Sequence, residues 1–205
     1  VLKSMPYERA QSSMASFSLC RECRTEYESP PDRRFHAQTI SCPNCGPRMW
    51  CSDRSGNLLA NQYEAIEMAA EAIEKRQIVA VRGLGGYQLF CDATSGSAVR
   101  MLRDRKRRPT KPLAVLVPSL EAAERLAEMA PCHRAALADS ANPIVMIPAR
   151  RPTCLADNVH PGLGEIGLLL PTTPLHALLL DRIDRPVVAT SGNREGDPLA
   201  HSAAE

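Results

Sequence analysis

The chain has 205 residues, and its 25 lysines and arginines against 23 acidic residues give a net charge of +2. That length fits one medium domain with a small appended module. With 44% hydrophobic and 23% charged residues, the composition excludes a disordered tail protein, and the near-neutral charge argues against a strongly electrostatic nucleic-acid binder.

No apolar run reaches about 18 residues, the length of a membrane-spanning helix. The N-terminus has no apolar stretch of the kind found in signal peptides. We therefore expect a cytoplasmic protein with no membrane contact. The first residue is Val rather than Met, so we also expect the chain to be a fragment of a longer protein.

Residues 1–18 are mixed polar and predict a linker, and residues 19–52 form a cysteine module. The module contains Cys20-x-x-Cys23 and, after eighteen residues, Cys42-x-x-Cys45, a spacing typical of zinc sites. Four thiolates close a tetrahedron and leave no open position, which favours a structural Zn²⁺. The alternative is a redox or disulfide pair. The module of roughly 35 residues has few large apolar groups, so metal binding would supply its folding energy.

Two smaller expectations accompany this site. Gly46 follows the second pair and can supply a left-handed turn. The remaining cysteines have no ligand spacing and are expected to be small buried hydrophobes; they are Cys51, Cys91, Cys132 and Cys154.

The turn-forming residues 53–57 predict a domain boundary, and the segment from 57 onward alternates helices with short strands. The expected helices span 61–76, 97–106, 120–129, 133–137 and 174–180. The expected strands span 78–81 (buried), 87–91, 113–117, 144–147, 166–170 and 186–190. This alternation predicts an α/β or α+β fold with a mixed sheet.

A glycine-rich turn follows the first of these strands and contains Gly83, Gly85 and Gly86. Such a turn allows the backbone to approach a ligand closely, especially a phosphate. It matches neither the dinucleotide-binding fingerprint nor the Walker loop. An ordinary tight turn is the alternative.

Seven cations lie within residues 100–111, opposed only by Asp104, and they repel one another unless an anion binds among them. Pro109 and Pro112 break the helix and would present the run as a loop. A polyphosphate or a nucleic-acid backbone is a suitable partner, and a solvated helix end is the alternative. The cations are Arg100, Arg103, Arg105, Lys106, Arg107, Arg108 and Lys111.

A polar turn after the last strand contains Thr190, Ser191 and Asn193, which suit a polar ligand site or a plain turn. His176 lies in a leucine-rich helix, where a structural histidine is favoured over a catalytic base. No nucleophile–base triad is apparent, so we expect no covalent catalytic residue.

Taken together, these segments resemble the HypF family, the carbamoyltransferases of nickel–iron hydrogenase maturation. The matching segments, in chain order, are the two CxxC pairs with residues 32–38 between them, Arg82 to Gly86, residues 91–94, Arg105 to Arg108, residues 111–115, residues 170–176 and Thr190 to Asn193.

The resemblance implies that residues 57–205 form a YrdC-like domain, incomplete at its C-terminus, with a twisted α/β sheet and a basic concave face. Lys106 and Arg108, with Lys111 nearby, would contact phosphates. Ser191 and Asn193 would contact the nucleotide or the small acyl substrate. The turn from Gly83 to Gly86 would line the same cavity.

The family's activity implies that ATP and carbamate, derived from carbamoyl phosphate, give carbamoyl-adenylate and pyrophosphate, with Mg²⁺ present. The carbamoyl group would then pass to the C-terminal cysteine of a HypE-type partner and become the cyanide ligand precursor. The alternative is a zinc-containing module that binds double-stranded RNA without catalysis. The family has four CxxC pairs and this chain has two, so crosswise ligation would place the two pairs on different metals.

Overall fold

The computed structural model describes residues 2–83 and 85–201, so Leu84 of the glycine-rich turn lies outside the described residues. The chain divides into two compact units, Val1–Gln62 and Tyr63–Glu205, each of which is described by itself. Within the described residues, no helix is long and apolar enough to cross a membrane.

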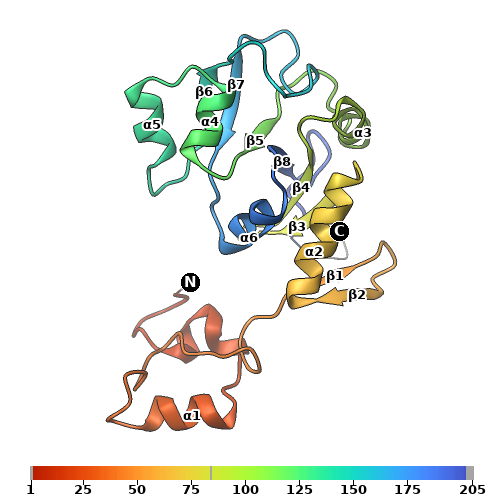
Figure 1. Ribbon diagram of the computed structural model, residues 1–205. Coiled ribbons are helices and arrows are strands. Elements are labelled where there is room, and N and C mark those ends of the chain that lie inside the picture. The colour runs from red at the N-terminus through yellow and green to blue at the C-terminus, as the bar shows by residue number, and fades with distance from the viewer. Residues whose placement is uncertain (1, 84, 202–205) are drawn as a thin grey trace. The chain divides into compact units, whose positions relative to one another are not determined.

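The first unit combines short helices with a two-stranded hairpin (Figure 1). Its elements are the 3-10 helices η1 (Arg9–Gln11) and η2 (Ser13–Ser16), helix α1 (Arg21–Glu28), and strands β1 (Trp50–Ser52) and β2 (Leu58–Asn61). The turn at 53–57, expected to be a boundary, instead closes the antiparallel β1–β2 hairpin, because Asp53 Oδ1 accepts from the backbone of Ser55 and Asn57.

Residues 1–18, expected to be a linker, contain η1 and η2 and bond to the cysteine module. The Arg9 guanidinium donates to the carbonyls of Gln38 and Ile40 at 3.1 and 2.6 Å, and to that of Phe17 at 2.8 Å. One half-buried cation thus satisfies three carbonyls and joins this segment to the module.

The second unit is a six-stranded mixed sheet in the order β3-β4-β8-β5-β7-β6 (Figure 1). Only the β5–β7 pair is parallel among these strands. The strands are β3 (Val79–Arg82), β4 (Tyr87–Asp92), β5 (Ala114–Leu116), β6 (Val145–Pro148), β7 (Glu165–Leu169) and β8 (Val187–Ser191). The helices are α2 (Gln62–Glu74), α3 (Gly96–Lys106), α4 (Leu120–Leu126), α5 (Pro131–Leu137) and α6 (Pro174–Arg182). This confirms the predicted mixed α/β class.

The helix starts are set by hydroxyl caps that satisfy free N–H groups of the first turn. Ser95 accepts from Ala98, Ser119 from Ala122 and Thr173 from His176. Residues of α3, α4 and α5 then bury one face of the sheet in an apolar core. The core side chains from the strands include Cys91, Val115, Ile147, Ile166, Leu168 and Val188.

Three element predictions need correction. The strand at 78–81 is not buried: β3 is at the edge of the sheet, with Ala80 and Arg82 exposed. The helix predicted over 120–129 ends at Leu126, because Ala127 is extended and bridges to Ala149. The first half of the basic run is helical, since α3 continues to Lys106 and is capped by Arg107 in a left-handed conformation.

Candidate functional site

The first unit brings all four predicted metal ligands together. The Sγ atoms of Cys20, Cys23, Cys42 and Cys45 lie within 4.8 Å of one another. Sγ of Cys42 is 3.6 Å from that of Cys20 and 3.8 Å from that of Cys45. A tetrahedral zinc site with Zn–S bonds of about 2.3 Å has sulfurs about 3.8 Å apart. Both pairs therefore fit one four-sulfur site within this chain, without crosswise ligation.

Local structure explains this convergence. Cys20 is the N-cap of α1 and Cys23 lies in its first turn, while Cys42 accepts from the backbone of Cys45 and Gly46 in a tight turn. Gly46 is not left-handed, contrary to expectation; a Cβ there would lie 2.8 Å from Ser41 Oγ and 2.9 Å from the Cys42 carbonyl. Glycine is needed at position 46 because any side chain there would collide with Ser41 and Cys42.

The thiols differ in acidity. Backbone hydrogen bonds from Cys20 and Cys42 lower the pKa of Cys45 to about 6, and burial raises the pKa of Cys23 to about 12. A cation that binds all four thiolates has to displace protons from the least acidic ones. Of the other cysteines, Cys91 is buried as expected, whereas Cys132 and Cys154 are exposed.

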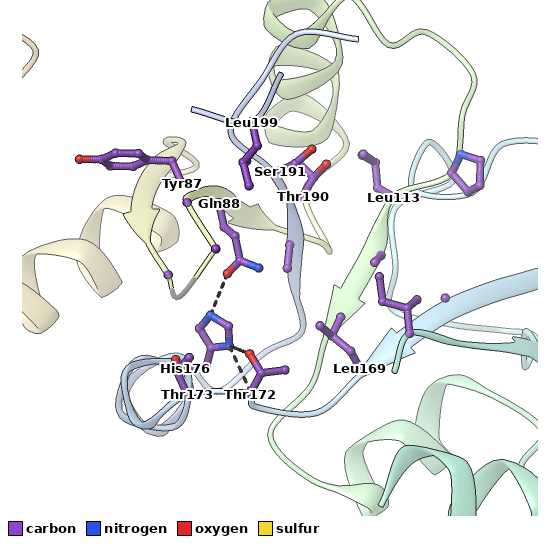
Figure 2. Close-up of a pocket in the computed structure, with 18 of the residues that line it drawn as sticks. Tyr87, Gln88, Leu113, Leu169, Thr172, Thr173, His176, Thr190, Ser191 and Leu199 are labelled. Carbon is purple, nitrogen blue, oxygen red and sulfur yellow. Dashed lines mark hydrogen bonds between the residues drawn. The ribbon is translucent and has the colours of Figure 1, made fainter. Parts of the chain in front are cut away.

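The second unit contains a pocket of about 530 Å³ on the sheet face opposite the apolar core (Figure 2). That volume is in the usual range for a small-molecule site. Most of the described lining residues come from the β3–β4 turn, the central strands and the start of α6. Among the predicted site residues, the lining includes Gly83, Gly85, Gly86, Arg108, Thr190 and Ser191.

Small residues make the pocket floor. Ala189 and Ala114 are register partners on β8 and β5, and Gly167 lies on β7 beside them. A Cβ on Gly167 would lie 3.0 Å from Ile144 and 3.3 Å from Met146 Sδ. Because side chains alternate across a strand, larger residues here would fill the pocket, whereas those on the other face fill the core.

Buried cations shape the pocket wall. Arg103 donates to the carbonyls of Arg108, Pro109 and Lys111 at 2.8–3.2 Å, and so fixes the loop that follows α3. Within that loop, Arg108 donates to the carbonyl of Pro112. Its Nε is buried and has no hydrogen-bond partner among the described residues.

Lys106, Lys111 and Asn193 are not among the described pocket-lining residues. Lys106 is 2% exposed as a residue, and its ammonium donates to the carbonyls of Ser191 and Asn193 at 2.5 and 2.6 Å. Lys111 pairs with Glu195 at 3.8 Å. The basic run and the polar turn therefore do lie together. Their contact is a pair of hydrogen bonds from Lys106 to the backbone of the turn, not a shared lining of the pocket by Lys106 and Asn193.

Three polar residues lie together at the foot of the pocket, Gln88, Thr172 and His176. Sequence reasoning singled out His176 and the segment 170–176 but missed Gln88. His176 is 1% exposed, and burial lowers its pKa. The available signal was that Gln88 is an uncharged polar residue within the otherwise apolar run 87–91.

Comparison with known families follows this division into two units. The family model named for Sua5, YciO and YrdC, described as "Telomere recombination", matches residues 71–205. The chain belongs to the Sua5/YciO/YrdC family. The "HypF finger" model matches residues 19–51, which contain the four-cysteine cluster.

Similar proteins point in the same direction. The "Carbamoyltransferase HypF" of Rhodobacter capsulatus is 48% identical over 97% of this chain. A solved "full-length HypF in the phosphate- and nucleotide-bound form" is 34% identical over the whole chain, with a TM-score of 0.84. P. abyssi Sua5 complexed with L-threonine is 25% identical over 69% of the chain, with a TM-score of 0.61.

These matches confirm the predicted resemblance to HypF and the YrdC/Sua5-like fold. The chain spans 26% of both the Rhodobacter capsulatus protein and the solved HypF chain, and 42% of the Sua5 chain.

Proposed function

We propose that the second unit binds ATP in the pocket above the small-residue floor and activates carbamate as carbamoyl-adenylate. A carbamate oxygen forms a bond to the α-phosphorus, the bond from that phosphorus to the bridging oxygen breaks, and pyrophosphate leaves with the electron pair. No protein nucleophile is needed, so positioning and charge stabilisation are sufficient.

The observation that most supports this proposal is the grouping of Arg108 with the glycine turn, Thr190 and Ser191 in one pocket. Arg108 lines the pocket and donates one N–H to the carbonyl of Pro112. Its guanidinium suits an oxyanion, because guanidinium groups bind phosphate through charge-assisted hydrogen bonds. The solved HypF similar to this chain was determined with phosphate and nucleotide bound.

The expected Mg²⁺ has less support. No described residue lining the pocket is a carboxylate, whereas protein sites for Mg²⁺ usually provide one or two carboxylates together with substrate phosphates. The lining therefore does not fit a protein-held Mg²⁺, and the proposed step does not depend on one.

For the first unit we propose a structural Zn²⁺ held by the four clustered thiolates. The donor set fits, since four sulfurs at tetrahedral spacing suit zinc and leave no position for a substrate. When bound, the metal would supply cross-links that a module with so small an apolar core lacks.

We further propose that the activated carbamoyl group is destined for the C-terminal cysteine thiolate of a HypE-type partner in hydrogenase maturation. This rests on the similarity to proteins named carbamoyltransferase HypF. The adenylate is a mixed anhydride, so the thiolate attacks its carbonyl carbon and AMP leaves with the electron pair.

Pyrophosphate release tests the proposal. The chain is given ATP with carbamate, from ammonium bicarbonate, or with carbamoyl phosphate. Loss of a charge-assisted hydrogen bond costs about 1.5–3 kcal/mol, so Arg108→Ala should lower activity and ATP affinity by about tenfold or more. Arg105→Ala, an exposed cation three residues earlier, should change neither.

Binding of double-stranded RNA, measured across a salt series, provides the competing outcome. A steep loss of binding with salt, together with no preference for ATP over other anions, would favour a nucleic-acid binder and contradict the enzyme. The burial of Arg103 and Lys106 leaves fewer cations of the basic run free for such a surface.

A further inference from the structure

A hydrogen-bonded series of three side chains forms the foot of the pocket, and the adenylation chemistry above does not use it. The backbone nitrogen of Thr172 lies 3.3 Å from His176 Nδ1, and the Thr172 hydroxyl lies 3.1 Å from the same atom. On its other side, His176 Nε2 lies 2.9 Å from Gln88 Oε1 (Figure 2).

The tautomer of His176 follows from the first of these contacts. A backbone N–H can only donate, so Nδ1 has to be an unprotonated acceptor. His176 is almost fully buried, and burial lowers its pKa, which keeps the ring neutral. A neutral imidazole has one N–H, and here it is on Nε2. That N–H therefore donates to the Gln88 carbonyl oxygen.

The orientation of the Gln88 amide follows in turn. Because its oxygen accepts from His176, its NH₂ group points away from the histidine into the pocket (Figure 2). The opposite orientation would place two donors face to face. The backbone places Gln88 beside Ser191, another pocket residue, because the two are register partners on β4 and β8.

We propose that Gln88 is a specificity-determining residue whose NH₂ donates to a carbonyl or carboxylate oxygen of the substrate. His176 is a positioning residue that fixes the amide in this direction. The site then selects an oxygen acceptor. It rejects an amine or ammonium group, because the N–H of that group would face the NH₂ donor of Gln88. This inference rests on the proposed function, since carbamate and carbamoyl phosphate both present such an oxygen.

The first test needs no substrate and so stands apart from the proposed function. Long-range ¹H–¹⁵N NMR spectra of the full chain should show His176 with a protonated Nε2 and an unprotonated Nδ1. A protonated Nδ1 would overturn the inference, because the ring would then accept from the Gln88 amide and turn the carbonyl oxygen toward the pocket.

The second test measures binding of carbamoyl phosphate, carbamate and ATP separately by titration calorimetry. Gln88→Glu replaces the donor by a carboxylate, and Gln88→Met removes it. The matched control, Gln77→Glu, adds the same charge at an exposed position outside the pocket lining. Circular dichroism confirms that each variant folds.

We expect Gln88→Glu to weaken binding of carbamoyl phosphate or carbamate by about tenfold or more. Gln88→Met should cause a smaller loss, and Gln77→Glu none. The ligand whose binding is weakened in Gln88→Glu is the one whose oxygen accepts from Gln88. Unchanged binding in Gln88→Glu, or no binding of either ligand by the parent chain, would overturn the inference. If Gln88→Glu weakens ligand binding as expected but the parent chain releases no pyrophosphate, the proposed adenylation would be contradicted and the role of Gln88 would stand.

Discussion

Lys106 illustrates how far a side chain's environment can depart from what its charge indicates. The residue is buried, and its ammonium donates to two carbonyls of the Ser191–Asn193 turn. Burial, and secondarily the charge of Arg108, lowers its pKa. Its geometry is that of a support for the pocket wall.

We therefore expect Lys106→Met to lower the free energy of unfolding by about 1–3 kcal/mol, the cost of leaving buried carbonyls unpaired. Arg105→Met, at an exposed position of the same helix, should change it by less than about 0.5 kcal/mol. Urea denaturation measures both. A fully stable Lys106→Met variant that loses ATP affinity but keeps adenosine affinity would indicate a direct phosphate contact instead.

His176 predicts a pH dependence of stability. Its folded-state pKa is lowered by burial, so below the unfolded pKa of about 6.5 the unfolded chain binds more protons than the folded chain. The free energy of unfolding should thus decrease as the pH falls from about 7 toward the lowered folded pKa.

In His176→Gln this part of the decrease below about pH 7 should disappear. Chemical denaturation at several pH values provides the comparison. An identical slope in His176→Gln and the parent would show that this ring does not stay neutral in the folded state.

At the scale of elements, the local sequence predicted a helix or strand correctly where a single signal, an apolar run or a helix cap, was strong. The apolar runs of β4, β5, β7 and β8 and the capped helices α3 and α6 were predictable within a residue or two. The edge position of β3 was not, because an apolar run looks the same whether one or two strands flank it. Placement of β8 between β4 and β5 joins segments about a hundred residues apart, and local pattern contains no information on that pairing.

The residues of the candidate sites also differ in how far local sequence predicts their placement. CxxC spacing predicts its own geometry, since each pair occupies one turn, and the four sulfurs do converge. By contrast, Lys106 and Arg108 are two residues apart at a helix end, and only the fold decides which of them lines the pocket. The histidine and glutamine at its foot depend on contacts 88 residues apart.

The cysteine module gives a prediction at this scale. Cys45→Ser removes the most acidic thiol of the cluster, so the purified variant should contain much less zinc than the parent, which should bind about one ion per chain. Cys51→Ser, a half-buried cysteine of β1 outside the cluster, should bind zinc like the parent. Metal analysis with thiol titration measures this. Equal zinc in Cys45→Ser and the parent would exclude the four-thiolate site.

At the scale of the whole molecule, the chain consists of two compact units with different sources of stability. The second has an extended apolar core between the sheet and three helices. The first has four clustered thiols and few buried apolar side chains. The two proposed roles, metal binding and nucleotide chemistry, therefore belong to separate units.

The most direct measurement of the central claim is an amide NMR titration of the full chain with ATP. The account predicts shifts at the glycine turn (Gly83, Gly85 and Gly86) and at Thr190 and Ser191, with residues 19–51 unchanged. Shifts confined to exposed cations such as Arg100 and Arg105, or to the cysteine module, with none at the glycine turn, would contradict it.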